Sequence, residues 1–410
     1  MRMKNLALGL LAGAAAIGCV SAPASALTIE LNNLNNVTPG TDAHHGFTVA
    51  AKFWETLITN DVTVKLNVGF SQLGAGILGS TGSTTNVAYV GQVFPALQAN
   101  GTSALDAIAS ANLPTTRPSP FVGGQAIDAL ISAPRMDGTG VGLPLSRVLD
   151  ADASGNNSAF SANTSLLKAL GITPTYTGAN AAVMADGSVS FSNQFAFDFD
   201  PTDGIDADKF DFIGVAVHEI GHALGFRSGV DTYDINTGFT GNLNGFALMS
   251  IWDIFRYSEQ SAALGVNDWA IGGTLANGDA PFFSIDGGAT VYDAGAYLST
   301  GRTNGDGRQA SHWKDNAPGQ PQLGILDPTV ARGQQSVITS LDLAGYDAMG
   351  WNISYDVMKH DKMFSTRILP NLGMANVPEP ATWAQMILGF GVLGAAARRV
   401  RRGKAALAVA

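Results

Sequence analysis

The sequence predicts an α+β fold, because both amphipathic helices and separate strands leave clear patterns in it. Residues 42–58 and 210–226 carry apolar side chains at helical spacing. Residues 62–68 alternate apolar and polar side chains, which is the period of a half-buried strand. Residues 229–310 are rich in Gly, Asn, Asp, Ser and Thr, which predicts long surface loops and hairpins. With 410 residues, of which 46% are hydrophobic, the chain is long enough to bury a large core.

The N-terminal elements follow one another closely. Residues 27–44 are polar and predict a strand and a loop. Asp42 lies near the start of the first long helix and can cap it, and the alternating strand 62–68 follows that helix. Between residues 89 and 135, two weaker helical patterns are separated by a turn at 100–101.

The remaining elements are shorter. A helix over 165–170 stops at Gly171, and alternating apolar residues over 189–199 predict two strands that pair as a hairpin. A short helical stretch is expected around 251–258, and a last helix covers 341–350.

Four segments divide the chain. Residues 1–26 read as a signal peptide, because two basic residues precede an apolar stretch and small residues end at Ala26. Residues 27–365 show no internal repeat or linker and predict one domain, followed by a tether over 366–377. Residues 378–410 form a sorting or transmembrane segment. A lipoprotein signal at Cys19 is the alternative for the leader, although Ala16 stands where a large aliphatic residue is expected.

The C-terminal segment places Pro378-Glu379-Pro380 before an apolar stretch and an arginine cluster. This order resembles the PEP-CTERM sorting signal of Gram-negative bacteria. The resemblance implies export, transient retention in the inner membrane, an exosortase-type sorting enzyme as partner, and a final place at the cell surface or in the extracellular matrix. An ordinary tail anchor is the alternative.

The charge distribution argues against a nucleic-acid partner, and the cysteine content argues against disulfide bonds. The chain has 23 basic and 33 acidic side chains, and the basic ones gather at its two ends. The acidic central part would repel a phosphate backbone, so nucleic acid is excluded as a partner. The single cysteine, Cys19, lies in the leader, so we expect no disulfide in the folded part.

Catalytic chemistry is predicted by the segment FDFIGVAVHEIGHALGF, residues 210–226. His218 and His222 are four residues apart and share one side of the predicted helix, so both imidazoles can bind one zinc ion. Glu219 can accept a proton from a water molecule that the zinc activates. The motif also occurs by chance, as two histidines and a glutamate on an ordinary helix face.

With Gly225, these residues resemble the zinc metalloendopeptidases called metzincins, whose third histidine would fall where this chain has Ser228. Leishmanolysin-like metzincins carry that histidine much later, in a segment like Ser311-His312-Trp313. The resemblance implies His312 as third ligand, a twisted mixed sheet, a long active-site helix, a loop-rich C-terminal half, and a peptide or protein substrate.

Other residues compete for roles in this site. Asp231, Asp253 and Glu259 are alternatives for the third ligand, because carboxylates also bind zinc. Leu326 stands where metzincins carry a methionine beneath the metal, and Met249 is an alternative that breaks the usual order. We interpret His44, His45 and His360 as structural or exposed, because no motif surrounds them.

Three weaker expectations complete the site. Asp198, Asp200 and Asp203 lie in an acidic stretch that could bind calcium, although a solvated acidic turn explains it as well. The strand 194–199 is expected to pair with an extended substrate. Tyr257 could donate a hydrogen bond to the oxyanion, or pack in the core.

The sequence therefore predicts an exported or surface-sorted zinc endopeptidase. The alternative is a non-catalytic surface or matrix protein that keeps the metal as a structural element. Glu219 favours catalysis, because a structural zinc site needs no base beside its first ligand.

Overall fold

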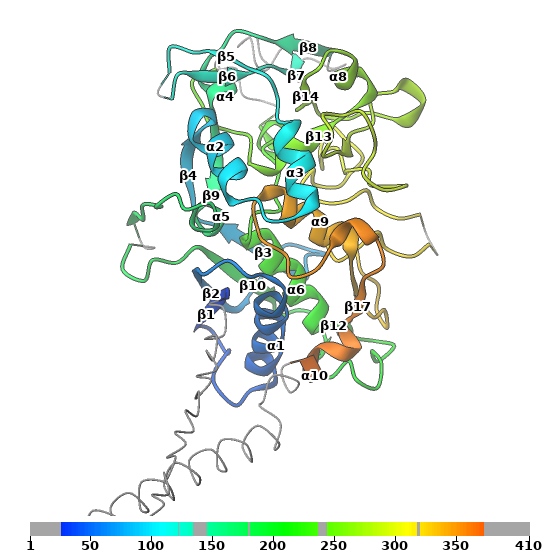
Figure 1. Ribbon diagram of the computed structural model, residues 1–410. Helices are drawn as coiled ribbons and strands as arrows, with labels where there is room; N and C mark the ends of the chain where they lie inside the picture. Colours follow the sequence, from blue (N-terminus) through cyan, green and yellow to red (C-terminus); the bar gives the residue numbers. More distant parts are fainter. Residues whose placement is uncertain are drawn as a thin grey trace, which may run out of the picture.

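The computed structural model describes residues 26–121, 123–133, 146–178, 181–236, 244–317 and 320–372, which form a mixed α+β structure with several sheets (Figure 1). The helices are α1 (Asp42–Leu57), α2 (Val90–Asn100), α3 (Ala104–Ala111), α4 (Gly155–Ser158), α5 (Thr164–Ala169), α6 (Phe212–Ala223), α7 (Val230–Ile235), α8 (Glu259–Ala263), α9 (Ser340–Met349) and α10 (Leu369–Leu372). The strands are β1 (Thr28–Asn33), β2 (Thr63–Ser71), β3 (Gly79–Ser83), β4 (Thr85–Tyr89), β5 (Thr116–Pro118), β6 (Gln125–Ile127), β7 (Ala129–Ala133), β8 (Ser146–Asp150), β9 (Ala159–Asn163), β10 (Gly187–Ser192), β11 (Phe197–Asp198), β12 (Phe210–Asp211), β13 (Arg256–Tyr257), β14 (Asn267–Asp268), β15 (Phe282–Phe283), β16 (Val337–Thr339) and β17 (Met363–Ser365).

The main sheet is mixed and has the order β1-β2-β10-β3. β1, β2 and β10 run parallel, whereas β3 pairs antiparallel with β10 and forms one edge. In β2, the alternating residues Val64, Leu66 and Val68 are fully buried. The alternation that predicted this strand therefore reflects one face turned to the core.

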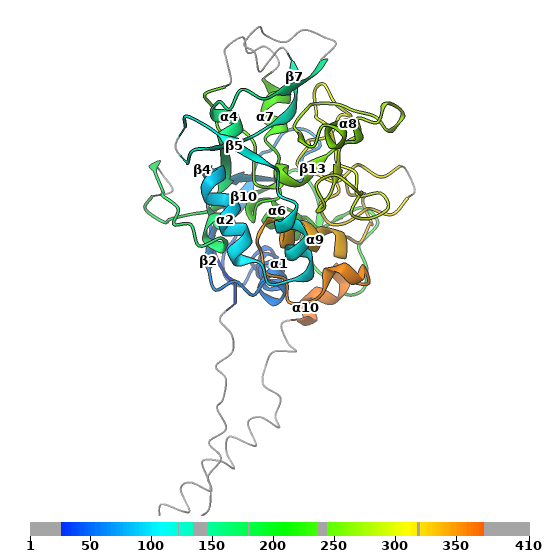
Figure 2. The same cartoon turned by 45° about the horizontal axis from the view of Figure 1, so that its top comes forward.

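Two helices cover this buried face. α1 contacts β1, α6 contacts β3 and β10, and the two helices also pack against each other. Phe47 of α1 meets Phe191 of β10 and Phe212 of α6 edge-on, with ring centroids 5.0 and 5.1 Å apart. The long helices predicted from the apolar spacing are therefore the two that line the sheet, and α6 lies near the centre of the molecule in both views (Figures 1 and 2).

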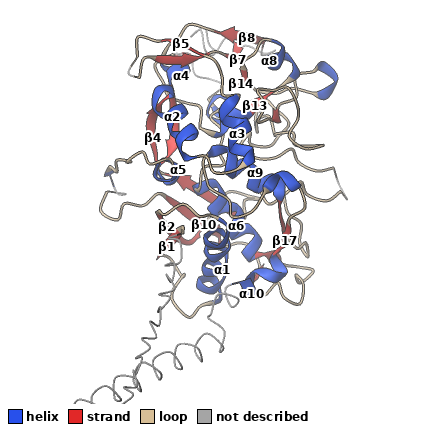
Figure 3. Cartoon of the chain, viewed as in Figure 1, coloured by secondary structure: helices blue, strands red, loops and turns tan. Residues whose placement is uncertain are grey.

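The rest of the chain is built from small sheets and loops around this centre. β4 pairs with β9, β5 with β6, β7 with β8 and β14, β13 with β15, and β16 with β17. Between β15 and β16, the described residues form loops joined by isolated bridges (tan in Figure 3). The loop-rich second half agrees with its composition.

The loop-rich second half of the chain is more deeply buried than the sequence suggested. Trp252, Trp269 and Trp313 are fully buried in the same continuous core that contains the sheet and α1. The polar composition of the segment hid this, because a few large aromatic side chains bury much apolar surface.

One local expectation was wrong and another was met over a shorter range. β10 and β11 do not form a hairpin, because β10 pairs with β2 and β3, whereas β11 pairs with β12. The short helical stretch expected around 251–258 is one turn of 3-10 helix, Trp252–Phe255. An alternating pattern identifies a strand but not its partner, and this explains the error.

The segment predicted as a tether is folded in its first part. Residues 366–372 form a 3-10 turn and α10, which packs against α1. Thr366 and Leu369 are both buried. Residues 373–377, the leader up to residue 25 and the sorting segment lie outside the described residues.

Candidate metal centre

Helix α6 forms where the sequence predicted it and carries the first two histidines. Asp211 caps its N-terminus by accepting a hydrogen bond from the backbone N–H of Gly214, at 2.9 Å. Its apolar stripe is fully buried and consists of Ile213, Val217, Ile220 and Leu224. The helix ends before Gly225, whose φ of +127° belongs to a region that side chains other than glycine avoid.

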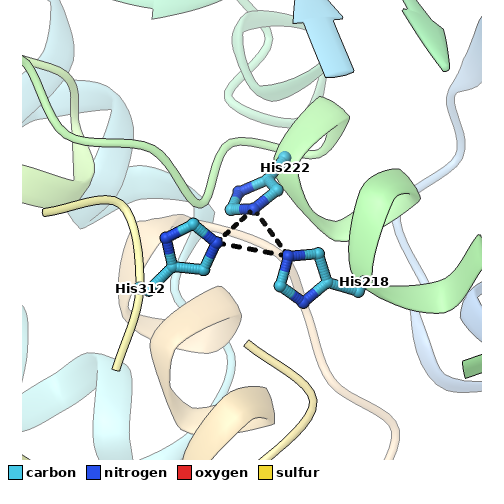
Figure 4. Close-up of side chains that lie close together, drawn as sticks. All are labelled: His218, His222 and His312. Atoms are coloured by element: carbon cyan, nitrogen blue, oxygen red, sulfur yellow. Dashed lines mark hydrogen bonds between the residues drawn. The ribbon is translucent and has the colours of Figure 1, made fainter. Parts of the chain in front are cut away.

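The structure brings His312 to the two histidines of α6. The Nε2 atoms of His218 and His222 are 3.0 Å apart, and the Nε2 atom of His312 lies 3.2 Å from His222 and 3.3 Å from His218. Figure 4 shows the three rings turned toward one point. The late histidine therefore lies beside the helical pair, as the resemblance implied.

The contact that Nδ1 makes in each ring determines which of the two ring nitrogens carries the proton. His218 Nδ1 lies 2.6 Å from the carbonyl oxygen of Ile325, His222 Nδ1 lies 2.6 Å from that of Phe226, and His312 Nδ1 lies 3.2 Å from that of Gln309. A carbonyl oxygen can only accept, so each Nδ1 carries the proton and donates it. Each Nε2 atom is then left with a lone pair, and the three lone pairs face one another.

Burial keeps these rings neutral. It lowers the pKa of His218 to about 4, and burial together with the charge of His218 lowers the pKa of His222 to about 3. The same causes hold the pKa of His312 well below its ordinary value. At neutral pH the site therefore presents three neutral imidazoles, the protonation state that binds a metal.

The spacing of the nitrogens fits a small divalent ion. Two ligand nitrogens at ~2.1 Å from a tetrahedral zinc ion are roughly 3.4 Å apart. The three Nε2 distances of 3.0 to 3.3 Å are close to this value. Within the described residues, His218, His222 and His312 form the one group of potential ligands whose binding atoms gather in this way.

Glu219 lies next to this group and is held by the edge strand β3. Thr81 Oγ1 lies 2.6 Å from Glu219 Oε2 and 2.8 Å from the backbone oxygen of Glu219. A Cβ atom at Gly79 would lie 2.6 Å from Glu219 Oε1, so only glycine leaves room for the carboxylate there. Burial raises the pKa of Glu219 to about 7, although the contact with Thr81 lowers it. A carboxylate with such a pKa can both accept and return a proton near neutral pH.

Asp342, in the first turn of α9, organises the backbone next to His218 and His312. Its carboxylate accepts hydrogen bonds from the N–H groups of Ile325 and Leu326, at 2.9 and 3.2 Å, and from the indole of Trp313, at 2.8 Å. The Ile325 carbonyl in turn accepts from His218. One buried carboxylate therefore orients the residue that holds His218 and the residue that follows His312.

Leu326 packs close to α6. It is fully buried, and a Cβ atom at Gly221 of α6 would lie 3.5 Å from its side chain. Met249 is buried elsewhere, where its carbonyl accepts from the N–H of Ser161.

A cleft of about 830 Å³ opens over the three histidines and Glu219. One side of it is β3, with Gly79, Ser80, Thr81 and Ser83. The hydrogen bonds at the ends of β3 connect Leu78 and Thr84 to the β10 side. By antiparallel alternation, the main-chain groups of Gly79, Thr81 and Ser83 point away from β10 and toward the free edge.

The segment expected to pair with substrate, 194–199, forms less strand than predicted, although Phe195 lines the cleft. Within 194–199 only Phe197 and Asp198 form a strand, and this strand pairs with β12 instead of bordering the main sheet. The free edge beside the histidines belongs to β3, a glycine- and serine-rich segment with no apolar alternation.

The alternative third ligands have other partners. Asp253 is fully buried and accepts hydrogen bonds from the N–H groups of Gly229 and Ser250, at 2.8 and 2.7 Å. Asp231 lines the cleft, but its oxygens accept from the loop that carries His312. Glu259 is exposed on α8, outside the cleft lining that the described residues form.

The remaining histidines and Tyr257 lie away from the centre. His44 and His45 belong to α1, and His360 lies 3.5 Å from Asp293 near the surface. Tyr257 is buried in β13 and is not among the described residues that line the cleft. The interpretation of Tyr257 as a core aromatic therefore fits better than a role at the oxyanion.

The acidic stretch before α6 uses its carboxylates within its own turns. Asp198 accepts hydrogen bonds from the N–H groups of Asp200 and Asp206, and Asp200 accepts from Thr202. Among the described residues, no three of these carboxylates gather as the histidines do. This part of the structure agrees with a structured acidic turn.

Sequence reasoning missed Thr81, Gly79 and Asp342. Each acts through a contact with a residue far away in the chain, and none lies in a catalytic motif. A signal for Asp342 was available, because Thr339 and Asp342 form a capping box at the start of the predicted last helix.

Comparison with known proteins identifies only the C-terminal end. Residues 376–402 match the PEP-CTERM protein-sorting motif. This motif indicates an exported protein of a Gram-negative bacterium that is sorted at the membrane, with an exosortase-type enzyme as partner. No curated protein and no solved structure is significantly similar to the chain. The described residues contain no helix that is both long and apolar enough to span a membrane.

Proposed function

We propose that this chain is an exported zinc endopeptidase that hydrolyses peptide bonds, with His218, His222 and His312 as metal ligands and Glu219 as general base. The observation that carries the proposal is the convergence of three unprotonated Nε2 atoms beside a buried carboxylate. Three protein ligands leave one coordination position open, as in catalytic rather than structural zinc sites.

The proposal includes a metzincin-like fold. Its support is a mixed sheet with one antiparallel edge strand, a zinc-binding helix that contacts this strand, and a loop-rich second half that supplies the third histidine. Ser228 and Leu326 depart from the family pattern without removing a catalytic group.

The residues of the chain would divide the work as follows. An extended peptide would pair with the free main-chain groups of Gly79, Thr81 and Ser83, an interaction that requires little side-chain specificity. A zinc ion in the site would polarise the scissile carbonyl and make the attacking water more acidic. Glu219 would take the proton of that water and return it to the leaving nitrogen. The contact with Thr81 would keep its carboxylate in place during both transfers.

A comparison of the purified full-length protein with Glu219→Gln and His312→Ala tests the proposal. We expect the parent to bind one zinc ion and to cleave an unfolded protein, measured by release of new amino termini. Glu219→Gln should keep the zinc but lose activity by about 10²- to 10⁴-fold, the usual contribution of a positioned general base. His312→Ala should lose the activity as well and should bind zinc far more weakly than the parent.

Two results would contradict the proposal. Digestion by Glu219→Gln at the parent rate would show that the carboxylate is not the base. A parent that binds zinc tightly and cleaves no peptide, with or without Glu219, would instead support the non-catalytic surface protein.

A further inference from the structure

We propose that α7 is a clamp that places His312 at the metal centre, with Asp231 and Asp234 as its two anchors. The proposal rests on the metal site of the proposed function, and it assigns a positioning role to two carboxylates that bind no metal themselves. The segment they hold is residues 300–312, which we call the histidine loop.

The histidine loop needs support from other elements, because the hydrogen bond of the His312 ring is long. His312 Nδ1 is 3.2 Å from its carbonyl partner, whereas the corresponding distances for His218 and His222 are 2.6 Å. The partner of His312 is Gln309, which belongs to the same loop. The helical pair is fixed by α6, whereas His312 is held on its C-terminal side through Trp313 and on its N-terminal side by its loop.

Asp234 holds the beginning of this loop. It is fully buried, and its carboxylate accepts hydrogen bonds from the N–H groups of Thr303 and Asn304, at 2.6 and 2.7 Å. The side-chain amide of Asn304 donates a third bond, at 3.1 Å. Charged acceptors form the stronger class of hydrogen bonds, so this end of the loop is firmly attached to α7.

Asp231 holds the end of the loop, next to the ligand. It lies three residues before Asp234, so both carboxylates are on the same side of α7. Its oxygens accept from the N–H groups of Ala310 and Ser311, at 2.6 and 3.1 Å, and from the Ser311 hydroxyl. Ser311 directly precedes His312, so Asp231 fixes the main chain from which that ring projects.

A second connection joins the same point to the end of the zinc-binding segment. The N–H of Ser228 donates to Ser311 Oγ at 2.8 Å, and the Ser228 hydroxyl donates to Asp253 at 2.5 Å. Ser228 stands where the family pattern would place the third histidine. A hydrogen bond from this position therefore reaches the residue beside the late histidine that replaces it.

Zinc affinity in isosteric variants tests the clamp without depending on activity. In Asp231→Asn the amide nitrogen would face N–H donors and lose at least one of these bonds. We expect zinc affinity, measured by competition with a chelator, to fall by about 10- to 100-fold, as for other residues that orient metal ligands. The loss should not exceed that of His312→Ala. Asp347→Asn, at a buried carboxylate of α9 outside the cleft lining, is the matched control and should bind zinc like the parent.

A double variant separates positioning from general destabilisation. If Asp231 acts through His312, then Asp231→Asn combined with His312→Ala should bind zinc no more weakly than His312→Ala alone. Ser311→Ala, which removes the shared hydroxyl, should weaken zinc binding in the same direction and serves if Asp231→Asn does not fold.

The outcomes distinguish the two proposals. A parent that binds no zinc contradicts the proposed function. A parent whose zinc affinity depends on His312 but is unchanged in Asp231→Asn and Ser311→Ala overturns the clamp and leaves the function standing. Additive losses in the double variant also overturn the clamp.

Discussion

At the scale of single residues, the site is defined by the three histidine Nε2 atoms, which carry no proton. Three backbone carbonyls accept hydrogen bonds from the Nδ1–H groups of the histidines, so the three Nε2 atoms carry lone pairs that face one another. Lone pairs gathered in a partly buried cleft are unfavourable unless a cation or a water molecule satisfies them. Glu219 is buried in the same cleft, where Thr81 and the space above Gly79 determine its orientation.

Thr81→Val tests the orientation of Glu219. Valine has a similar shape to threonine but no hydroxyl, so the carboxylate would lose its hydrogen bond and its fixed position. We expect kcat to fall by about tenfold to 10²-fold with little change in KM, because misplacement affects the proton transfer more than substrate binding. Peptide hydrolysis by the full-length protein is the measurement.

Thr81→Ser is the control for this prediction, because it keeps the hydroxyl and should retain most of the activity. Equal kcat values for the valine and serine variants would show that the contact does not matter to Glu219. Zinc content should be the same in both.

At the scale of elements, α9 holds two buried carboxylates near its opposite ends, and burial raises the pKa of both. Asp342 lies in its first turn, where the helix dipole and hydrogen bonds from the Thr339, Ile325 and Leu326 N–H groups and the Trp313 indole oppose this rise. Asp347 lies near its C-terminus, where the dipole disfavours a negative charge, and burial, followed by the charge of Asp106, raises its pKa to about 7. The Ser103 hydroxyl donates to it at 2.7 Å, but its Oδ1 atom is buried without a hydrogen-bond partner.

Asp347 should make stability depend on pH. Its pKa is about 7 in the folded state and near 3.8 when unfolded, so between these values only the folded state keeps the proton. Folding stability should therefore fall as the pH rises from about 4 to about 7, and then level off. Asp347→Asn keeps an acceptor for Ser103 and carries no charge, so it should be more stable than the parent at pH 8, on the order of 3 kcal/mol.

Urea unfolding of both proteins at pH 4 and pH 8 measures this effect. The two should differ much less at pH 4, where Asp347 is protonated in the folded parent. Asp361→Asn, at an exposed carboxylate, should change stability by only about 0.5 kcal/mol at either pH. A constant difference between parent and Asp347→Asn across this range would contradict the assignment.

At the scale of the whole molecule, the helix of the candidate metal centre is attached to the C-terminal end of the described chain. α6 is capped by Asp211, and the Thr366 hydroxyl donates to the same carboxylate at 2.6 Å. The N–H of Ser336 also donates to it, at 3.0 Å. The last described segment is therefore attached to the start of α6, and residues 366–372 belong to the folded body.

Removing this segment should weaken the whole structure. A chain that ends at residue 365 would lose the bond between Thr366 and Asp211, a contribution of about 2 kcal/mol, and the burial of Leu369, about 2 kcal/mol more. We expect a clearly lower urea midpoint than for a chain that ends at residue 377. Equal midpoints would mean that residues 366–372 are a tether after all.

Local sequence was enough to predict the elements whose pattern depends on near neighbours. The helical period placed His218, Glu219 and His222 on α6, and it also gave α1 and α9. The sorting motif was recognised for the same reason, since its three parts are consecutive in the chain.

Only the tertiary structure decided what each element meets. The alternation of β10 did not reveal that it pairs with β2 and β3, and nothing in Gly79–Ser83 indicates an edge strand that holds Glu219. His312 was suggested by resemblance, but its meeting with two rings about ninety residues earlier depends on Asp231, Asp234 and Asp342. Most of the partners of these carboxylates are backbone N–H groups, which leave no signature in the sequence. Local periods arise from the geometry of a few adjacent residues, whereas these contacts arise from packing the whole chain around one core, and a short sequence window does not contain that information.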